Sequence, residues 1–332
     1  MSRPVKTTKD HLARRPLSAA LSFLLLIAIG ASFAAPAQPA APNRPGQRRP
    51  INRRPMPKAE WLEPDRSAPN GTQYQTFHSQ VLDLDISFLS WLPPGYEQGA
   101  KRYPVIYWLH GMGGNQRGGA TMFLPHVQAA IKEGKLPPCI VVFVNGMVKA
   151  FYCDSADGKV PMESVIIKDL IPHVDQTWRT IARREARVIE GYSMGGYGAA
   201  HLGFKYPDLF GTVVINAGAL IDPQPGNIPN GGPMYGVFGE DNARRVAEHP
   251  RELARKNADQ LRGKTRIRIG CGSQDGLLPR NQDLHEVLTK LGIEHEFQIV
   301  PDVAHESPRY YRLLGTKVFE FHRKSLAGVV SP

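Results

Sequence analysis

From about residue 60 onward, short apolar runs alternate with segments of helical periodicity, and this alternation constrains the fold more than any other feature. Strands are predicted over residues 74–79, 84–92, 103–109, 140–144, 187–190, 211–215, 266–270 and 296–300. Helices are predicted over residues 119–133, 166–178 and 194–206, and a last one begins near Ser307. Strands interleaved with helices indicate an α/β protein, a mostly parallel sheet with helices on both faces.

In two of these predicted helices, a proline affects where the helix begins or ends. Pro172 lies inside the pattern over 166–178, and we expect it to kink or end that helix, because proline lacks a backbone donor and clashes with the preceding turn. Ser307 is expected to cap the last helix, with Pro308 in its first turn. We expect residues 59–328 to form one domain, since about 270 residues suit a single α/β sheet.

The first 34 residues have the order of a secretory signal. A basic stretch precedes an uncharged run over 17–35, and Ser32 and Ala34 place small residues at positions −3 and −1 of a cleavage site. We therefore predict a signal peptide over 1–34 and a secreted or periplasmic protein. The alternative is a membrane anchor formed by residues 17–35, because this run approaches the ~20 residues that span a bilayer.

Residues 35–58 contain seven prolines, five arginines and no acidic residue. A segment with so little apolar surface cannot offset its chain entropy, so we predict a disordered linker. Residues 1–58 hold eleven of the 41 Lys and Arg but one of the 30 Asp and Glu, and they account for +10 of the net charge of +11. The remaining chain is nearly neutral, which argues against a nucleic-acid partner.

No pattern in the sequence indicates a metal or a cofactor. The three cysteines, Cys139, Cys153 and Cys271, have no zinc-site spacing, and their odd number leaves one without a disulfide partner. Cys139 and Cys271 lie in or beside apolar runs and are best explained as small core residues. Neither a phosphate-binding loop nor an H-E-x-x-H motif is present in the sequence.

The segment Gly191-Tyr192-Ser193-Met194-Gly195 matches G-x-S-x-G and lies between a predicted strand and a predicted helix. A serine on such a sharp turn needs neighbours without bulk on both sides, which Gly191 and Gly195 provide. The helix that follows directs its positive dipole end toward developing negative charge. We predict that Ser193 is a nucleophile; the alternative is a glycine-rich turn with an incidental serine.

A serine hydroxyl needs a base to take its proton. His305 directly follows the last predicted strand and is the candidate base. Asp275 follows the strand before it and is the candidate acid, which would orient the imidazole and stabilise its cation. The chain order serine, acid, histidine is the one expected with this motif. Asp302 is the alternative acid.

The tetrahedral intermediate needs two donors for its oxyanion. One is expected to be the backbone N–H of Met194, the residue after the nucleophile. The other is expected in the glycine-rich loop over 110–114, which follows a strand. We assign it to the N–H of Met112, with the N–H of Gly111 as the alternative.

Further segments carry a family resemblance. They are Trp-Leu-Pro-Pro-Gly-Tyr over 91–96, Leu-His-Gly-Met-Gly-Gly over 109–114 and Leu-Ile-Pro-His-Val-Asp over 170–175. With the serine motif, they make the chain from about Phe77 to Phe321 resemble the "Putative esterase" family of α/β-hydrolases, which includes esterase D (S-formylglutathione hydrolase), feruloyl esterases and secreted mycolyltransferases. The resemblance implies the α/β-hydrolase fold and hydrolysis of carboxylic esters by a Ser-His-Asp triad without metal or cofactor.

Export disfavours a cytosolic glutathione thioester and favours a small-molecule or polysaccharide-linked ester, such as a feruloyl or acetyl group, as substrate. We expect His110, Gly113 and Tyr192 to contact it. Phe151 and Tyr152 are candidates for an acyl pocket, although core packing explains them equally well.

The long irregular segment 217–240, which includes Tyr235, is a candidate cover for the site. Two other functions remain open. One is an acyltransferase that uses the same triad with an alcohol in place of water. The other is a non-catalytic surface binding protein with this fold, against which the presence of Ser193, Asp275 and His305 argues.

Overall fold

The computed structural model describes residues 60–223 and 232–329. The chain divides into two units, residues 1–53 and 54–332, and the first of these lies wholly outside the described residues. The predicted signal peptide and linker therefore also lie outside them. Among the helices of the described part, none combines the length and the apolar character needed to cross a membrane.

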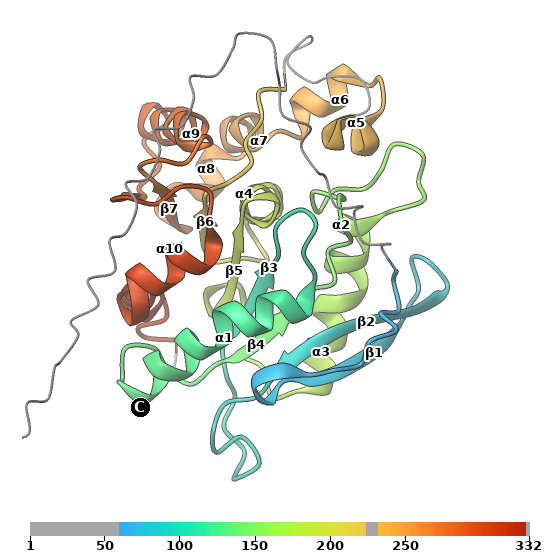
Figure 1. Ribbon diagram of the computed structural model, residues 1–332, viewed down its shortest axis with the longest axis vertical. Coiled ribbons are helices and arrows are strands. Elements are labelled where there is room, and N and C mark those ends of the chain that lie inside the picture. Colours follow the sequence, from blue (N-terminus) through green and yellow to red (C-terminus); the bar gives the residue numbers. More distant parts are fainter. Residues whose placement is uncertain (1–59, 224–231, 330–332) are drawn as a thin grey trace, which may run out of the picture. The chain divides into compact units, whose positions relative to one another are not determined.

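The framework is an eight-stranded sheet with the order β1-β2-β4-β3-β5-β6-β7-β8 (Figure 1). Its strands are β1 (Gln73–Ser79), β2 (Leu84–Trp91), β3 (Val105–Leu109), β4 (Ile140–Phe143), β5 (Arg187–Tyr192), β6 (Thr212–Asn216), β7 (Arg266–Gly272) and β8 (Glu296–Val300). The β1–β2 and β2–β4 pairs are antiparallel, and the five remaining pairs are parallel. The sheet thus confirms the predicted, mostly parallel α/β architecture.

Helices fill the connections between the strands. The α-helices are α1 (Gln116–Lys132), α2 (Met162–Ser164), α3 (Ile171–Thr177), α4 (Met194–Lys205), α5 (Pro233–Phe238), α6 (Asn242–Ala247), α7 (Pro250–Lys256), α8 (Ala258–Leu261), α9 (Leu278–Lys290), α10 (Ser307–Leu314) and α11 (Glu320–Ser325). The other helical segments are η1 (Pro69–Gly71), the π-helical η2 (Val165–Leu170), η3 (Arg184–Ala186) and η4 (Gly315–Phe319).

The sheet separates two hydrophobic layers, because successive side chains of a strand point to opposite faces. In β3, Tyr107 packs in the layer that contains buried residues of α3, α4, α7 and α9. Its neighbour Trp108 packs in the layer that contains residues of α1, α10 and α11. Burial on both faces explains why the central strands read as continuous apolar runs in the sequence.

The prediction that Pro172 kinks or ends its helix is wrong in one respect, because α3 continues through the proline to Thr177. The π-helical segment η2 directly precedes α3, and the N–H of Ile171 donates to the carbonyl oxygen of Ile166, five residues earlier. This wider turn gives the proline ring the room that a regular α-helical turn lacks.

The predicted cap of the last helix is displaced by one residue. Ser307 is the first residue of α10, and the N-cap position falls on Glu306, without a side-chain capping hydrogen bond. Pro308 lies in the first turn as predicted, where its missing N–H costs no intrahelical bond.

Candidate active site

Ser193 occupies the sharp turn between β5 and α4. Its backbone dihedrals, φ 60° and ψ −116°, lie where a residue with a side chain is found only when its surroundings hold it there. Its N–H donates to the carbonyl oxygen of Asn216 (2.9 Å), and its own carbonyl oxygen accepts the N–H groups of Ala219 (2.9 Å) and Tyr197 (3.0 Å). The end of β6, the segment after β6 and the first turn of α4 therefore all hold the serine turn.

Gly191 and Gly195 are required by this turn, as the sequence predicts. A Cβ atom on Gly191 would lie 2.2 Å from the carbonyl oxygen of Gly195, and one on Gly195 would lie 2.0 Å from that of Leu109. Both contacts involve backbone atoms, which cannot move aside without opening the turn. The glycines therefore let the strand, the turn and the loop after β3 approach one another.

The structure brings Ser193, His305 and Asp275 together from three separate loops. The Nε2 atom of His305 lies 2.9 Å from Oγ of Ser193, and its Nδ1 atom lies 2.7 Å from Oδ2 of Asp275. A carboxylate only accepts hydrogen bonds, so Nδ1 carries a proton and Nε2 is free to accept the serine proton. The His305 side chain remains 40% exposed, which leaves it accessible from solvent.

Asp275 is held independently of the histidine. It is 4% exposed, and its Oδ1 atom accepts the N–H of Leu277 (2.8 Å), so each carboxylate oxygen has its own donor. Asp302, the alternative acid, is exposed on the loop after β8. Its backbone N–H donates a hydrogen bond to Oγ of Ser273 (3.0 Å). The geometry therefore favours Asp275 over Asp302 as the partner of His305.

The glycine-rich loop after β3 lies against the serine. A Cβ atom on Gly111 would be 3.4 Å from Cβ and 3.9 Å from Oγ of Ser193. Within the described part of the chain, the backbone N–H groups of Gly111, Met112 and Met194 have no hydrogen-bond acceptor. Donors from both predicted segments are thus available to an oxygen near the serine hydroxyl.

His110 has a different place from the one predicted. It is 2% exposed; Nδ1 donates to the carbonyl oxygen of Gly111 (2.9 Å), and Nε2 accepts the N–H of Gly146 (3.1 Å). Burial lowers the pKa of its imidazole to about 4, so the ring is neutral near pH 7. The prediction that His110 contacts the substrate is corrected: the ring braces the loop from inside the protein.

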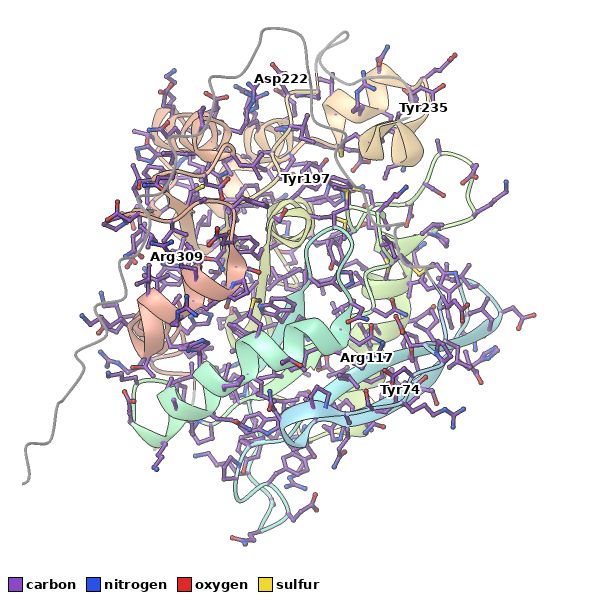
Figure 2. All side chains as sticks on the ribbon, in the orientation of Figure 1. Tyr74, Arg117, Tyr197, Asp222, Tyr235 and Arg309 are labelled. Carbon is purple, nitrogen blue, oxygen red and sulfur yellow. The ribbon has the colours of Figure 1, made fainter. Side chains whose placement is uncertain are left out.

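The two candidate acyl-pocket aromatics are also core residues. Tyr152 is fully buried and its hydroxyl donates to the carbonyl oxygen of His110 (2.9 Å). Phe151 is 2% exposed and packs edge-on against Tyr197, which lies on α4 (Figure 2). Both rings are packed in the core in this structure, in agreement with core packing as their explanation.

The remaining predicted contacts lie near the site. Gly113 has φ 78°, which favours glycine, and its N–H donates to Val148 O (3.1 Å). Tyr192 is 4% exposed, and its ring centroid is 5.2 Å from that of His305. The Tyr192 ring therefore packs against the histidine ring, and its contact with a substrate stays a prediction.

The segment 217–240 is described in part, over 217–223 and 232–240. Tyr235 lies on α5 within it (Figure 2), and its hydroxyl donates to Oε1 of Glu240 (3.4 Å). The middle of the segment lies outside the described residues, so its role as a cover stays a prediction.

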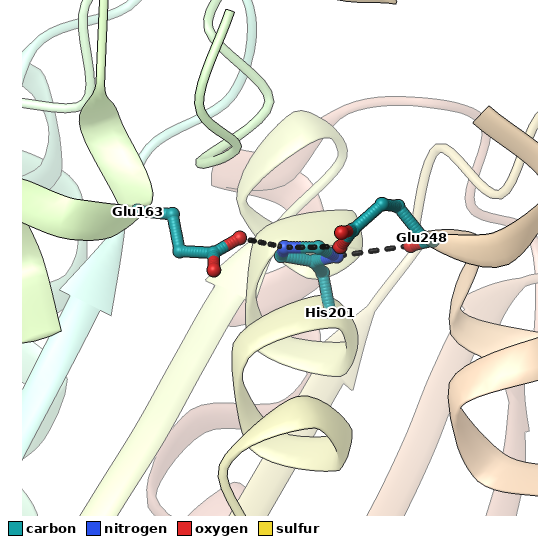
Figure 3. Close-up of side chains that lie close together, drawn as sticks. All are labelled: Glu163, His201 and Glu248. Atoms are coloured by element: carbon teal, nitrogen blue, oxygen red, sulfur yellow. Dashed lines mark hydrogen bonds and ion pairs between the residues drawn. The ribbon is translucent and has the colours of Figure 1, made fainter. Parts of the chain in front are cut away.

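One cluster in the described part has the ligand spacing of a metal site. Ligand atoms of Glu163, His201 and Glu248 lie within 4.8 Å of one another (Figure 3). However, Lys205 Nζ lies 2.9 Å from Oε1 of Glu163 and 2.6 Å from Oε2 of Glu248. An ammonium group thus already supplies the cation, and we assign the cluster as an ion-pair network.

His201 is the second cation of this network. Its Nε2 lies 2.7 Å from Glu163 Oε2 and its Nδ1 lies 3.0 Å from the carbonyl oxygen of Glu248, so both ring nitrogens face acceptors. Burial acts to lower its pKa, but Cys153 and Glu163 raise it well above its usual value. For Glu163, burial acts to raise the pKa, but the contacts with His201 lower it to about 2. Glu163 and His201 therefore form a charged pair near neutral pH.

Sequence reasoning missed two buried polar residues behind the site, Glu190 and Asn216. Glu190 is fully buried in β5, and Asn216 is the last residue of β6. A glutamate inside the apolar run Val188-Ile189-Glu190 was the available signal, because a buried carboxylate must have specific partners.

Comparisons with known proteins agree with this fold. The family model described as "Putative esterase" matches residues 79–330. An esterase of Mycobacterium tuberculosis is 27% identical over 267 residues, which cover 72% of this chain and 57% of that protein. An endo-1,4-beta-xylanase/feruloyl esterase of Xylanibacter ruminicola is 33% identical over 164 residues, which cover 46% of this chain and 22% of that protein.

A solved structure of a ferulic acid esterase has a TM-score of 0.64 with 23% identity, covering 76% of this chain and 98% of that one. The sheet order, the serine turn and this likeness define the α/β-hydrolase fold. This chain belongs to the "Putative esterase" family, which confirms the predicted family. It spans little more than half the length of its mycobacterial relative.

Proposed function

We propose that this protein is a serine carboxylic-ester hydrolase in which Ser193 is the nucleophile, His305 the general base and Asp275 the orienting acid. The observation that carries the proposal is the unbroken chain of contacts from Ser193 Oγ to His305 Nε2 (2.9 Å) and from His305 Nδ1 to Asp275 Oδ2 (2.7 Å). Membership of an esterase family and relatives named esterase support the same reaction class.

In the acylation half-reaction, Ser193 Oγ attacks the ester carbonyl carbon while its proton passes to His305 Nε2. The tetrahedral intermediate then collapses, the bond to the alcohol oxygen breaks, and His305 returns the proton to that oxygen. In deacylation, water attacks the acyl-serine and gives its proton to His305. The second tetrahedral intermediate collapses, the bond between the acyl carbon and Ser193 Oγ breaks, His305 returns the proton to Oγ, and the carboxylic acid leaves.

The negative oxygen of each intermediate is stabilised by backbone N–H groups at the start of α4 and in the loop after β3. Met194 supplies the first donor, and Met112 or Gly111 the second. Their lack of acceptors among the described residues supports this role, because a preorganised donor needs no rearrangement when charge develops. Loss of one such donor typically lowers kcat by about 10²–10³-fold.

We further propose feruloyl or acetyl esters linked to polysaccharide as the substrate class. A relative named endo-1,4-beta-xylanase/feruloyl esterase supports this choice, because its name joins a feruloyl esterase to an enzyme that acts on the polysaccharide xylan. Export through residues 1–34 would bring the enzyme to such polymers. Mass spectrometry of the mature N-terminus after expression with the full leader tests the export, and retention of Met1 would contradict cleavage.

The catalytic proposal is tested with p-nitrophenyl acetate and methyl ferulate on wild-type protein and the Ser193→Ala variant. The expected result is hydrolysis of at least one ester by the wild type and a loss of about 10³-fold or more in kcat in the variant. Equal turnover by a folded Ser193→Ala protein would show that the serine is not the nucleophile.

A further inference from the structure

Behind the site, a buried carboxylate connects the nucleophile strand with the helix that follows the base. Glu190 lies three residues before Ser193 and is fully buried. Its Oε1 accepts the Asn216 amide (2.9 Å) and the Tyr311 hydroxyl (3.2 Å), and its Oε2 accepts Nε2 of His322 (2.8 Å). Each partner satisfies part of a charge that would otherwise be costly to bury.

Asn216 is the centre of this network. Its backbone oxygen accepts the N–H of Ser193 (2.9 Å), a bond that holds the serine turn. Its side-chain Oδ1 accepts the Tyr310 hydroxyl (2.8 Å) and Nη1 of Arg268 (3.2 Å), while its Nδ2 donates to Glu190. One residue therefore fixes the nucleophile through its backbone and is itself fixed through its side chain.

The tyrosines connect the network to the base. Tyr310 and Tyr311 lie in α10, which begins two residues after His305. The Tyr310 hydroxyl reaches Asn216 over Gly270, where a Cβ atom would lie 2.1 Å from that hydroxyl oxygen. A shift of α10 relative to β5 and β6 would thus have to break these hydrogen bonds.

We propose that Glu190, Asn216 and Tyr310 are positioning residues that hold Ser193 Oγ within proton-transfer distance of His305 Nε2. None of them touches the reacting atoms; they act by joining the two loops that carry the nucleophile and the base. Proton transfer depends steeply on such geometry, and small displacements of reacting groups cost large factors in rate. This inference rests on the proposed function.

The chain offers a matched control at the other end of α4. Glu163 forms a buried pair with His201 at 2.7 Å, much like the Glu190–His322 pair at 2.8 Å, and Tyr206 donates to Glu163 as Tyr310 donates to Asn216. His201 lies eight residues after Ser193 along α4, which is about 12 Å of helix. This network should therefore affect stability without affecting the distance between nucleophile and base.

The test compares Glu190→Gln with Glu163→Gln, and Tyr310→Phe with Tyr206→Phe, in the full chain. Melting temperature, kcat and KM for p-nitrophenyl acetate are measured well below each melting point. We expect similar loss of stability within each pair. We expect kcat to fall about tenfold or more in Glu190→Gln and threefold or more in Tyr310→Phe, with KM within twofold of wild type, while both controls keep wild-type kcat.

Each tyrosine variant removes only one hydroxyl group. The comparison of these two variants therefore still tests the inference if a glutamine variant does not fold. Wild-type kcat in Tyr310→Phe and in folded Glu190→Gln would overturn the inference, as would equal losses of kcat in the controls. In both cases Ser193-dependent hydrolysis by the wild type would leave the proposed function intact. If the wild type showed no Ser193-dependent hydrolysis, the proposed function itself would fail, and the inference with it.

Discussion

His305 Nδ1 lies 2.7 Å from Oδ2 of Asp275, and the other oxygen of this carboxylate is held by the N–H of Leu277. The aspartate is buried and its position is set by its own loop, so the imidazole is oriented by a fixed partner. This relationship determines which ring nitrogen faces Ser193.

We expect Asp275→Asn to lower kcat about 10³-fold or more, because an amide no longer selects the tautomer that leaves Nε2 unprotonated and no longer stabilises the imidazolium. Asp302→Asn is the matched control and should stay within twofold of wild type. Steady-state kinetics of both variants show which aspartate acts with His305. A greater loss in Asp302→Asn would assign the acid to Asp302 instead.

Gly111→Ala should lower kcat/KM tenfold or more while the protein stays folded. The new methyl group would stand at ordinary contact distance from the serine, 3.9 Å from Oγ, where it occupies space that a substrate carbonyl needs. Gly118→Ala in α1 is the control, because its Cβ would meet only Asn115 Oδ1 at 3.6 Å. Unchanged kcat/KM in Gly111→Ala would argue against the loop after β3 as an oxyanion donor.

Gly195→Ala should destabilise the protein by well over the about 1 kcal/mol of an average substitution, because its Cβ would lie 2.0 Å from the carbonyl oxygen of Leu109. Gly236→Ala in α5 meets nothing within 4 Å and should be neutral or stabilising, by up to about 1 kcal/mol. Urea unfolding followed by circular dichroism measures both. Equal stabilities would contradict the close packing of the serine turn.

Stability should fall as the pH is lowered, in part through His249. Burial, with the nearby Arg251 charge, lowers the pKa of His249 to about 3, against about 6.5 in an unfolded chain. Between these values the unfolded state binds more protons, so the free energy of unfolding decreases on acidification, by up to about 1.4 kcal/mol per pH unit from this group. Well above pH 6.5 the imidazole is neutral in both states, and the group contributes no pH dependence.

The variant His249→Asn isolates this contribution. His249 is the N-cap of α7 and its side chain accepts the N–H of Arg251, a role that asparagine also performs. The slope of unfolding free energy against pH should become shallower between pH 6.5 and 4 in the variant. An unchanged slope would mean that His249 is not buried in its neutral form.

The sequence predicted those parts of the fold that depend on local patterns. Apolar runs located the eight strands, and Gly191 and Gly195 marked the serine turn. Both patterns can be recognised because each depends on only a few neighbouring residues. The pairing of Glu190 with His322 has no such signal, because the two are 132 positions apart and meet only when α11 packs against the sheet.

The wrong prediction for His110, and the choice that the sequence left open for Tyr152, have a related cause. His110 and Tyr152 belong to loops near the nucleophile, and the sequence does not reveal whether a loop side chain points outward or into the core. Their backbone-directed hydrogen bonds show that they support the loops instead. A residue that lies beside a functional loop can therefore support that loop from the core without contacting a ligand.

The central claim is that the Ser193 hydroxyl becomes transiently acylated, and reaction with a fluorophosphonate followed by peptide mass spectrometry tests it most directly. We predict one adduct per native molecule, on Ser193, absent from Ser193→Ala and formed far more slowly in His305→Ala. If Ser193 stayed unlabelled in folded protein after this reaction, or if an adduct on another residue persisted in Ser193→Ala, the account would be contradicted.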